Sequence, residues 1–385
     1  MKHNNIIALL GFVFLTHYIT VFAQPVIDTN LSFNNSKYAT YIIKLDSSSV
    51  KRISIVPNYS GLSHTEFVEE RTHNFGPNMF LINACINDDN GAPLGLLLSN
   101  EFEISKTNLA DGSGNFFLKP NGVFSVCKNE VHITESNAFS KSHNCTNAVQ
   151  TGPMLVINNT IHPKFVQGSI NKNIRCGVGL YTDKGIKYLV FAESLYQVNF
   201  YEFASLFKDH FNCENALCLE SANCSTHFPG LGIIDQSEKK YVGSYILYDA
   251  ELNPRPKTVI KMQKSISGVF EIPVELNGVL KISFIFDTGA SDVTISPDVA
   301  LTLIRTGTIT KQDFIGTRTY SFANGETAES DVFVLREVKI GNYIVKNVVA
   351  SISTSLAAPM LLGQSVMQRL GKFSVDNNNH TLIID

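Results

Sequence analysis

The sequence lacks the patterns that mark several classes of protein. It has no long basic run and a formal net charge of −3, so we expect no nucleic-acid binding. It has no Cys-x-x-Cys, and its histidines do not stand at metal-ligand spacing beside the cysteines, so we expect no metal site and no cofactor. With 385 residues, 44% of them hydrophobic and 17% charged, the chain fits a folded protein of two or three domains.

Cysteine is absent from the last part of the chain. All seven cysteines come earlier, at Cys85, Cys127, Cys145, Cys176, Cys213, Cys218 and Cys224. Such segregation indicates two domains that are built differently. Because seven is an odd number, at least one thiol is unpaired or pairs between chains.

Residues 1–23 have the pattern of a signal peptide. A short polar head precedes the apolar core Ile6 to Leu15, and Val21-Phe22-Ala23 offers small residues where a signal peptidase reads them. The alternative is an uncleaved anchor, but polar residues interrupt the run, which is short for a membrane span. No later segment is long and apolar enough to cross a bilayer. We therefore expect an exported protein, periplasmic or secreted, with no membrane span after cleavage, in which disulfides can form.

The rest of the chain divides at a polar, proline-containing stretch. Residues 24–250 contain mostly short strand patterns with one helical pattern from Tyr201 to Phe211, and we expect a mixed α+β domain. Residues 251–264, which include Asn253-Pro-Arg-Pro-Lys257, are expected to form a linker.

Residues 265–385 alternate apolar and polar side chains and contain strong hairpin signals such as Asn277-Gly278. One short helix is expected from Gln364 to Leu370, where Gly371 provides a C-terminal cap. Hairpins with one late helix predict an all-β domain that closes into a small barrel.

The segment FIFDTGASDVTIS, from Phe284 to Ser296, places one acid at the end of an apolar run. An ionised carboxylate is disfavoured at the end of a buried strand. One reading is an ordinary turn that ends the strand. The other is chemical, because Asp287-Thr288-Gly289 has the form in which an aspartic protease presents half of its catalytic pair.

The region from 265 to 385 resembles the retroviral-type, retropepsin-like aspartic proteases in their single-domain bacterial form. Besides the Asp287 turn, the resemblance rests on a flap-like hairpin from Ser321 to Glu326 and on Met360-Leu-Leu-Gly363 just before the helix. It implies that Phe322, Asn324 and Gly325 cover the substrate, and that Leu361, Leu362 and Gly363 pack beneath the catalytic turn. Asn324-Gly325 also fits an ordinary surface hairpin, and Leu361 and Leu362 also fit core packing.

The resemblance implies hydrolysis by two carboxylates that share one proton around a water molecule, because two like charges a few ångströms apart cannot both ionise. Thr288 would hold the pair flat, and Gly289 would let the backbone approach it. No second Asp-Ser/Thr-Gly occurs in the chain. The pair must therefore come from two chains, and we expect a homodimer that cleaves protein or peptide substrates with apolar side chains.

Residues 60–230 resemble the phosphodiester glycosidases related to the enzyme that uncovers mannose 6-phosphate. The stretches that carry this resemblance are 81–84, 93–96, 114–124, 150–156, 161–165, 174–179 and 198–204. The resemblance implies Asn83, Arg175 and Glu220 as site residues and a glycan or sugar phosphate as ligand. Arg175 suits a phosphate because its guanidinium forms paired, charge-assisted hydrogen bonds.

The sequence departs from this family at two motifs. Leu219-Glu-Ser221 stands where the family has Leu-Asp-Gly, and Asn83-Ala-Cys85 stands where it has Asn-Ala-Gly. Glutamate reaches one methylene further than aspartate, and such misplacement costs catalysis. The three site residues are therefore equally compatible with a relic or structural role. If the two motifs meet in space, as the resemblance implies, a disulfide could join Cys85 to Cys224.

Three functions follow from these observations. The first is an exported, dimeric aspartic endopeptidase that carries a glycosidase-like domain for targeting or regulation. The second is a sugar phosphodiester hydrolase whose protease domain serves self-processing. The third is a glycan-binding protein whose protease fold acts only in dimerisation.

Overall fold

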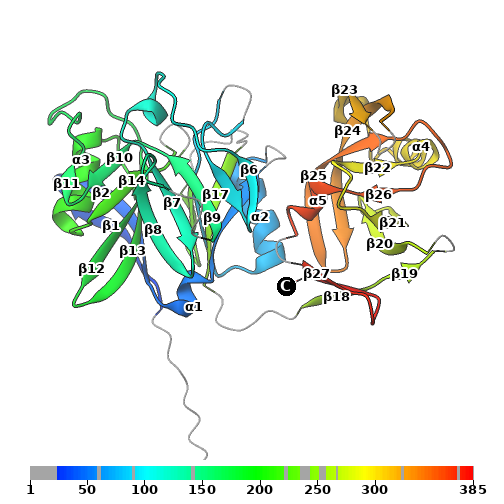
Figure 1. Ribbon diagram of the computed structural model, residues 1–385, viewed down its shortest axis with the longest axis horizontal. Coiled ribbons are helices and arrows are strands. Elements are labelled where there is room, and N and C mark those ends of the chain that lie inside the picture. Colours follow the sequence, from blue (N-terminus) through cyan, green and yellow to red (C-terminus); the bar gives the residue numbers. More distant parts are fainter. Residues whose placement is uncertain are drawn as a thin grey trace, which may run out of the picture.

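The computed structural model describes residues 24–58, 62–88, 92–139, 144–220, 224–234, 243–250, 257–265, 268–321, 325–370 and 373–384. The expected signal peptide lies outside them. Figure 1 shows two bodies side by side, the N-terminal one in blue to green and the C-terminal one in yellow to red. Among the described residues, no helix is long and apolar enough to cross a membrane.

The N-terminal domain is built on a seven-stranded antiparallel sheet. Its strands, in spatial order, are β1 (Val26–Phe33), β2 (Ser36–Lys44), β13 (Ile186–Ser194), β12 (Cys176–Asp183), β14 (Asn215–Cys218), β10 (Met154–Ile157) and β11 (Thr160–Ile161). The pairing of β12 with β13 runs unbroken from Cys176 opposite Glu193 to Asp183 opposite Ile186.

Two five-stranded sheets complete the domain. One has the order β16 (Gly232–Ile234), β15 (Thr226–Phe228), β4 (Met79–Asn83), β17 (Gly243–Asp249) and β3 (Ile53–Asn58). The other has the order β6 (Phe102–Ser105), β5 (Leu97–Ser99), β9 (Cys145–Thr151), β7 (Gly122–Cys127) and β8 (Glu130–Glu135). One buried core joins all three sheets: Tyr41 stacks on Phe80 at 4.2 Å between ring centroids, and Phe80 meets Phe191 at 5.0 Å.

The helices of this domain are few. Among the described residues they are α1 (Ser47–Val50), α2 (His64–Phe75), α3 (Phe200–Ser205), its π-helical continuation η3 (Leu206–His210) and the 3-10 turn η1 (Asn115–Phe117). The helix expected from Tyr201 to Phe211 is confirmed as α3 and η3. The expected mixed α+β class is wrong, because three sheets cover one another's apolar faces and leave little for helices to cover.

The C-terminal domain contains an eight-stranded sheet. Its order is β19 (Gln263–Lys264), β20 (Phe270–Leu276), β21 (Leu280–Phe286), β26 (Leu361–Leu362), β22 (Val293–Ile295), β25 (Tyr343–Ile352), β24 (Thr327–Ile340) and β23 (Phe314–Ser321). Two residue pairs also join β20 to β24. The closed barrel stays a prediction. The expected Asn277-Gly278 turn is confirmed, with φ of 48° and 69° between β20 and β21.

A three-stranded sheet, β18 (Thr258–Lys261), β28 (Thr381–Ile384) and β27 (Phe373–Asp376), lies at the end of this domain that carries the C-terminus (Figure 1). β18 and β19 fall within residues 251–264, so the C-terminal part of the expected linker is folded into the domain. The expectation of one short helix is wrong: the described residues contain α4 (Pro297–Arg305) as well as α5 (Gln364–Met367) and the 3-10 turn η4 (Lys311–Asp313). Ser296 occupies the N-cap position of α4 without a side-chain capping bond, Pro297 is its first residue, and Val299, Ala300 and Leu303 are buried.

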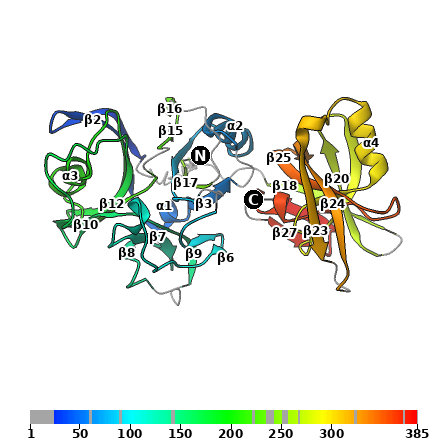
Figure 2. The same cartoon turned by 90° about the horizontal axis from the view of Figure 1, so that it is seen from above.

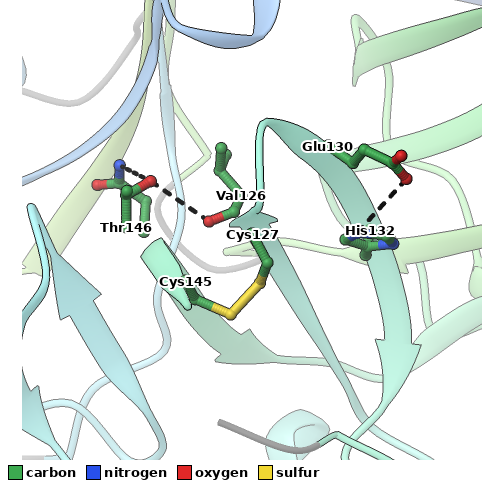
Figure 3. Close-up of a disulfide and its surroundings, with 7 residues drawn as sticks. Val126, Cys127, Glu130, His132, Cys145 and Thr146 are labelled. Atoms are coloured by element: carbon green, nitrogen blue, oxygen red, sulfur yellow. Dashed lines mark hydrogen bonds and ion pairs between the residues drawn. A yellow bond between two sulfur atoms is a disulfide. The ribbon is translucent and has the colours of Figure 1, made fainter. Parts of the chain in front are cut away.

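A disulfide joins two neighbouring strands of the N-terminal domain (Figure 3). Cys127 at the end of β7 is bonded to Cys145 at the start of β9, with a sequence separation of 18. Next to it, the Thr146 hydroxyl donates to the Val126 carbonyl at 3.3 Å. The bond therefore closes a loop that contains all of β8.

We predict that replacing Cys127 and Cys145 by serine lowers the free energy of unfolding by about 3 kcal/mol, because the unfolded chain loses the loop constraint. Urea unfolding of the oxidised proteins measures this difference. The control is the oxidised wild type, with the second disulfide verified by mass spectrometry in both proteins. An unchanged free energy of unfolding would contradict the prediction.

Candidate active site

Asp287, the aspartate of the Asp-Thr-Gly turn, directly follows the last residue of β21. β21 pairs in parallel with β26 through Ile285–Leu361 and Phe286–Leu362, and the Asp287 N–H donates to the Leu362 carbonyl at 3.1 Å. Leu361 and Leu362 thus lie directly beside the turn that they were expected to support. Asp287 itself is half-buried, and Thr288 and Gly289 are exposed.

The turn after Asp287 is fastened at several points. The Asp287 carboxylate accepts the Gly289 N–H at 2.8 Å, and the Gln364 side chain donates to the Thr288 carbonyl at 2.8 Å. The Gln364 N–H also donates to the Ala290 carbonyl at 2.9 Å. The start of α5 therefore holds the turn in one shape, with Asp287 at the surface of the domain.

Gly363 is required by close backbone packing. A Cβ atom at this position would lie 2.6 Å from the Ala290 carbonyl oxygen and closer still to that of Asp292. Its backbone is extended, so space and not a left-handed conformation demands glycine here. Any side chain at 363 would push α5 away from the catalytic turn.

Asp292 ties the same segment to the hairpin strand β23. It is buried, and its carboxylate accepts hydrogen bonds from Arg318 at 2.9 Å and from the Tyr320 hydroxyl at 2.7 Å. Burial, together with this carboxylate, raises the pKa of Tyr320 to about 12, so the hydroxyl remains a donor. These contacts fasten the segment that follows the Asp287 turn to β23.

Of the three residues expected in the flap, the described residues include only Gly325. β23 and β24 pair as far as Ser321–Thr327, so the hairpin turns where the sequence indicated. Gly325 is exposed with φ of 85°. Phe322 and Asn324 lie outside the described residues.

Two of the expected N-terminal site residues, Arg175 and Glu220, lie near Cys218 at a junction of two sheets. Both residues affect the pKa of the buried Cys218 thiol. Burial raises this pKa to about 12, the positive charge of Arg175 lowers it, and the negative charge of Glu220 raises it. The Leu219 N–H donates to the Cys176 carbonyl at 2.9 Å, which fixes the end of β14 beside the start of β12. Two of the three expected residues thus lie near Cys218.

Arg175 is fully buried and largely committed to the protein. Its Nε donates to the Val198 carbonyl at 2.9 Å, its Nη2 donates to the Asn171 carbonyl at 3.3 Å, and its guanidinium lies 3.5 Å from the centroid of the Phe200 ring. Burial lowers the pKa of Arg175. Nη1 has no hydrogen-bond partner among the described residues, so one donor is left for a ligand.

Asn83 reaches the same junction from β4. It is buried, its N–H donates to the Ser225 carbonyl at 3.3 Å, and its Oδ1 has no partner among the described residues. The neighbouring Thr226 hydroxyl lies 3.9 Å from Cys176 Sγ. The segment 224–226 therefore connects Asn83 to the start of β12.

The disulfide expected between Cys85 and Cys224 is wrong. Cys224 is bonded to Cys176, and Cys85 donates its S–H to Asn87 at 3.1 Å. The pairing follows from the junction just described, which carries residue 224 to the start of β12. Cys85, Cys213 and Cys218 are buried thiols.

Glu193 was missed by the sequence analysis. It is buried, and its carboxylate and the sulfurs of Cys176 and Cys224 lie within 4.8 Å of one another. Disulfide sulfurs do not act as thiolate ligands, so this trio does not hold a metal in the oxidised protein. The signal was present in the sequence, because Glu193 ends the apolar run from Leu189 to Ala192 much as Asp287 ends β21.

Two family models match the chain. Residues 79–227 match "Phosphodiester glycosidase", and residues 272–369 match "gag-polyprotein putative aspartyl protease". The chain carries a phosphodiester glycosidase-like domain and a retropepsin-like domain. Both resemblances drawn from the sequence are confirmed.

Three comparisons by sequence and structure each cover part of this chain. The "Uncharacterized protein YigE" of Escherichia coli (strain K12) is 36% identical over 149 residues, which are 39% of this chain and 58% of that protein. A retropepsin-like aspartic protease from Rickettsia conorii superposes with TM-score 0.26 and 27% identity over 34% of this chain and 89% of its own. The zebrafish N-acetylglucosamine-1-phosphodiester alpha-N-acetylglucosaminidase catalytic domain gives TM-score 0.38 and 13% identity over 60% of this chain and 89% of its own.

We predict that Asp292→Ala loosens β23 about tenfold, because Arg318 and Tyr320 lose their common acceptor. Hydrogen exchange of the β23 amides measures the loosening directly and should rise by a similar factor. Asp331→Ala, which removes an exposed acid from the same hairpin, is the control. Equal exchange in the two variants would show that the Asp292 contacts do not hold the strand.

Proposed function

We propose that this protein is an exported aspartic endopeptidase whose active site forms from Asp287 of two chains. The observation that carries the proposal is the turn at Asp287: a half-buried carboxylate at a strand end, held by β26 and α5 and open on its Thr288 side. The match to the aspartyl protease model covers this turn and the Gly363 element. Export rests on the signal-peptide pattern of residues 1–23.

The mechanism follows from the charge of the pair. Each chain supplies one Asp287, so the two carboxylates meet on a two-fold axis with a water molecule between them. Because like charges at this distance cannot both ionise, the pair holds one proton. One carboxylate takes a proton from the water as it attacks the peptide carbonyl, and the other donates its proton to the carbonyl oxygen.

The backbone of the turn supports this chemistry. The Gly289 N–H donates to the Asp287 carboxylate and keeps it oriented towards the open side of the turn. Gln364 fixes the Thr288 carbonyl from behind, which leaves the Thr288 side chain exposed to meet its counterpart across the axis. The hairpin of β23 and β24 would close over an extended peptide.

We expect Asp287→Asn to reduce cleavage of a peptide library by about 10²–10⁴-fold, because the pair loses its general acid and base. When it is measured from about pH 3 to 7, wild-type cleavage should be faster in acid than at neutral pH, since the pair must hold one proton. It should also rise faster than linearly with protein concentration. Asp298→Asn, an exposed acid of α4, is the control. A demonstrably dimeric wild type that cuts nothing more than the Asp287 variant would sink the proposal.

A second function, hydrolysis of a sugar phosphodiester, is favoured by one observation. Arg175 and Glu220 are both buried, and one guanidinium nitrogen of Arg175 has no partner among the described residues. An anionic phosphodiester would supply that partner. The match of residues 79–227 to the phosphodiester glycosidase model is consistent with such a ligand.

We predict that combining Glu220→Asp with Ser221→Gly raises turnover of a sugar phosphodiester by about tenfold or more, since a one-methylene misplacement is corrected. The measurement is release of the sugar, with Arg175→Lys added to the double variant as the control that should remove the gain. If the double variant turns over no faster than the wild type, the second function is rejected.

A further inference from the structure

The two domains meet through a helix of the first and a strand of the second. Figures 1 and 2 both show α2 on the side of the glycosidase-like domain that faces the retropepsin-like domain. From α2, Glu70 accepts the Lys346 N–H of β25 at 2.7 Å and also binds the Arg369 guanidinium. Arg71 donates to the Arg369 carbonyl at 3.2 Å. Glu70, Arg71 and Arg369 are at most 3% exposed.

Burial of three charged side chains indicates a defined contact. An ionised group removed from water is costly unless it is paired and hydrogen-bonded, so chance contact of two surfaces would leave these groups solvated. At the end of α2, Asn74 adds a matched pair of hydrogen bonds, accepting the Ile344 N–H at 3.0 Å and donating to the Ile344 carbonyl at 2.8 Å. Glu69 and Lys346 form an ion pair at 3.6 Å at the rim.

These contacts provide hydrogen-bond acceptors for backbone N–H groups at the unpaired edge of β25. Residues 343–348 of β25 pair with β24 on one side, whereas β22 covers β25 on the other side only from Ala350 onwards. Asn74 and Glu70 bind the Ile344 and Lys346 N–H groups that would otherwise face water. An open edge invites another chain, and here a helix of the same chain covers it.

The same contact brings the glycosidase-like domain next to the catalytic turn. A cleft of about 190 Å³ is lined on one side by the hairpin of β5 and β6, including Asn100 and Phe102. On the other side it is lined by Thr288, Gln364 and Phe373 of the retropepsin-like domain. The β5–β6 hairpin of the glycosidase-like domain therefore lies across this cleft from Thr288.

We propose that the glycosidase-like domain occupies, in the same chain, the face of the retropepsin-like domain that a second copy must reach. The inference rests on the proposed function, because a dyad on a two-fold axis requires a second Asp287 beside this one. Thr288 adjoins Asp287, so the partner's turn must enter the space that the β5–β6 hairpin bounds. The arrangement described here is a latent monomer, and dimerisation requires α2 to leave β25.

The test uses the full chain and one matched pair of variants. Asn74→Asp places a carboxylate oxygen against the Ile344 carbonyl, and it also removes the donor, so it should open the contact. His73→Asp puts the same charge on the neighbouring, exposed residue of α2 and is the control. Carbodiimide joins Glu69 to Lys346 where the contact is closed, and mass spectrometry measures the yield of that crosslink.

We expect the wild type and His73→Asp to be monomers that give the crosslink and cleave peptides poorly. Asn74→Asp should lose most of the crosslink, dimerise at about tenfold lower concentration in sedimentation and cleave peptides correspondingly better. If Asn74→Asp loses the crosslink but dimerises like the wild type, the proposal is overturned. A wild-type dimer with full crosslink yield would overturn it as well.

The outcomes separate this proposal from the proposed function. Easier dimerisation of Asn74→Asp without any cleavage would support the covered face and reject the endopeptidase. If Asn74→Asp does not fold, Lys346→Glu tests the contact from the retropepsin-like domain, because it places a second negative charge beside Glu69. Lys339→Glu on β24 is its control. Dimerisation of Lys346→Glu is measured alongside that of a full-length variant that carries both Lys346→Glu and Glu69→Lys. If Lys346→Glu dimerises like the wild type, the proposal is overturned.

Discussion

The retropepsin-like domain depends on the close approach of two backbone segments at Gly363. This residue lies so near the carbonyl oxygens of Ala290 and Asp292 that no side chain fits. Its contact sets where α5 begins, and the start of α5 in turn fixes the Thr288 carbonyl. The direction of the Asp287 carboxylate is thus decided by backbone packing.

The two domains bury polar groups for different reasons. In the retropepsin-like domain, Asp292 has both its partners on β23, so its burial fastens one element to another. At the junction of the glycosidase-like domain, Asn83 and Arg175 retain polar atoms that no described residue satisfies. Buried groups of this kind are usually paired. In the second proposed function, a sugar phosphodiester would pair with the Arg175 nitrogen that has no partner among the described residues.

Local sequence patterns predicted several elements of the retropepsin-like domain. The Asn277-Gly278 hairpin, the strand that ends at Asp287 and the helix after Gly363 could be predicted because each depends on neighbouring residues. Helix α4 begins with Ser296 and Pro297, and this start signal went unread beside the stronger strand pattern. The class of the glycosidase-like domain was mistaken because packing among three sheets is not visible in any one strand.

The sequence by itself determined that each chain offers a single Asp-Thr-Gly turn and that two different domains are joined. Only the tertiary structure decided that Cys224 pairs with Cys176 and that Glu70 binds Arg369 across 299 positions of chain. The reason is physical: a turn or a cap is fixed by atoms a few residues apart. A buried ion pair or a covered strand edge depends on where whole sheets and helices come to lie.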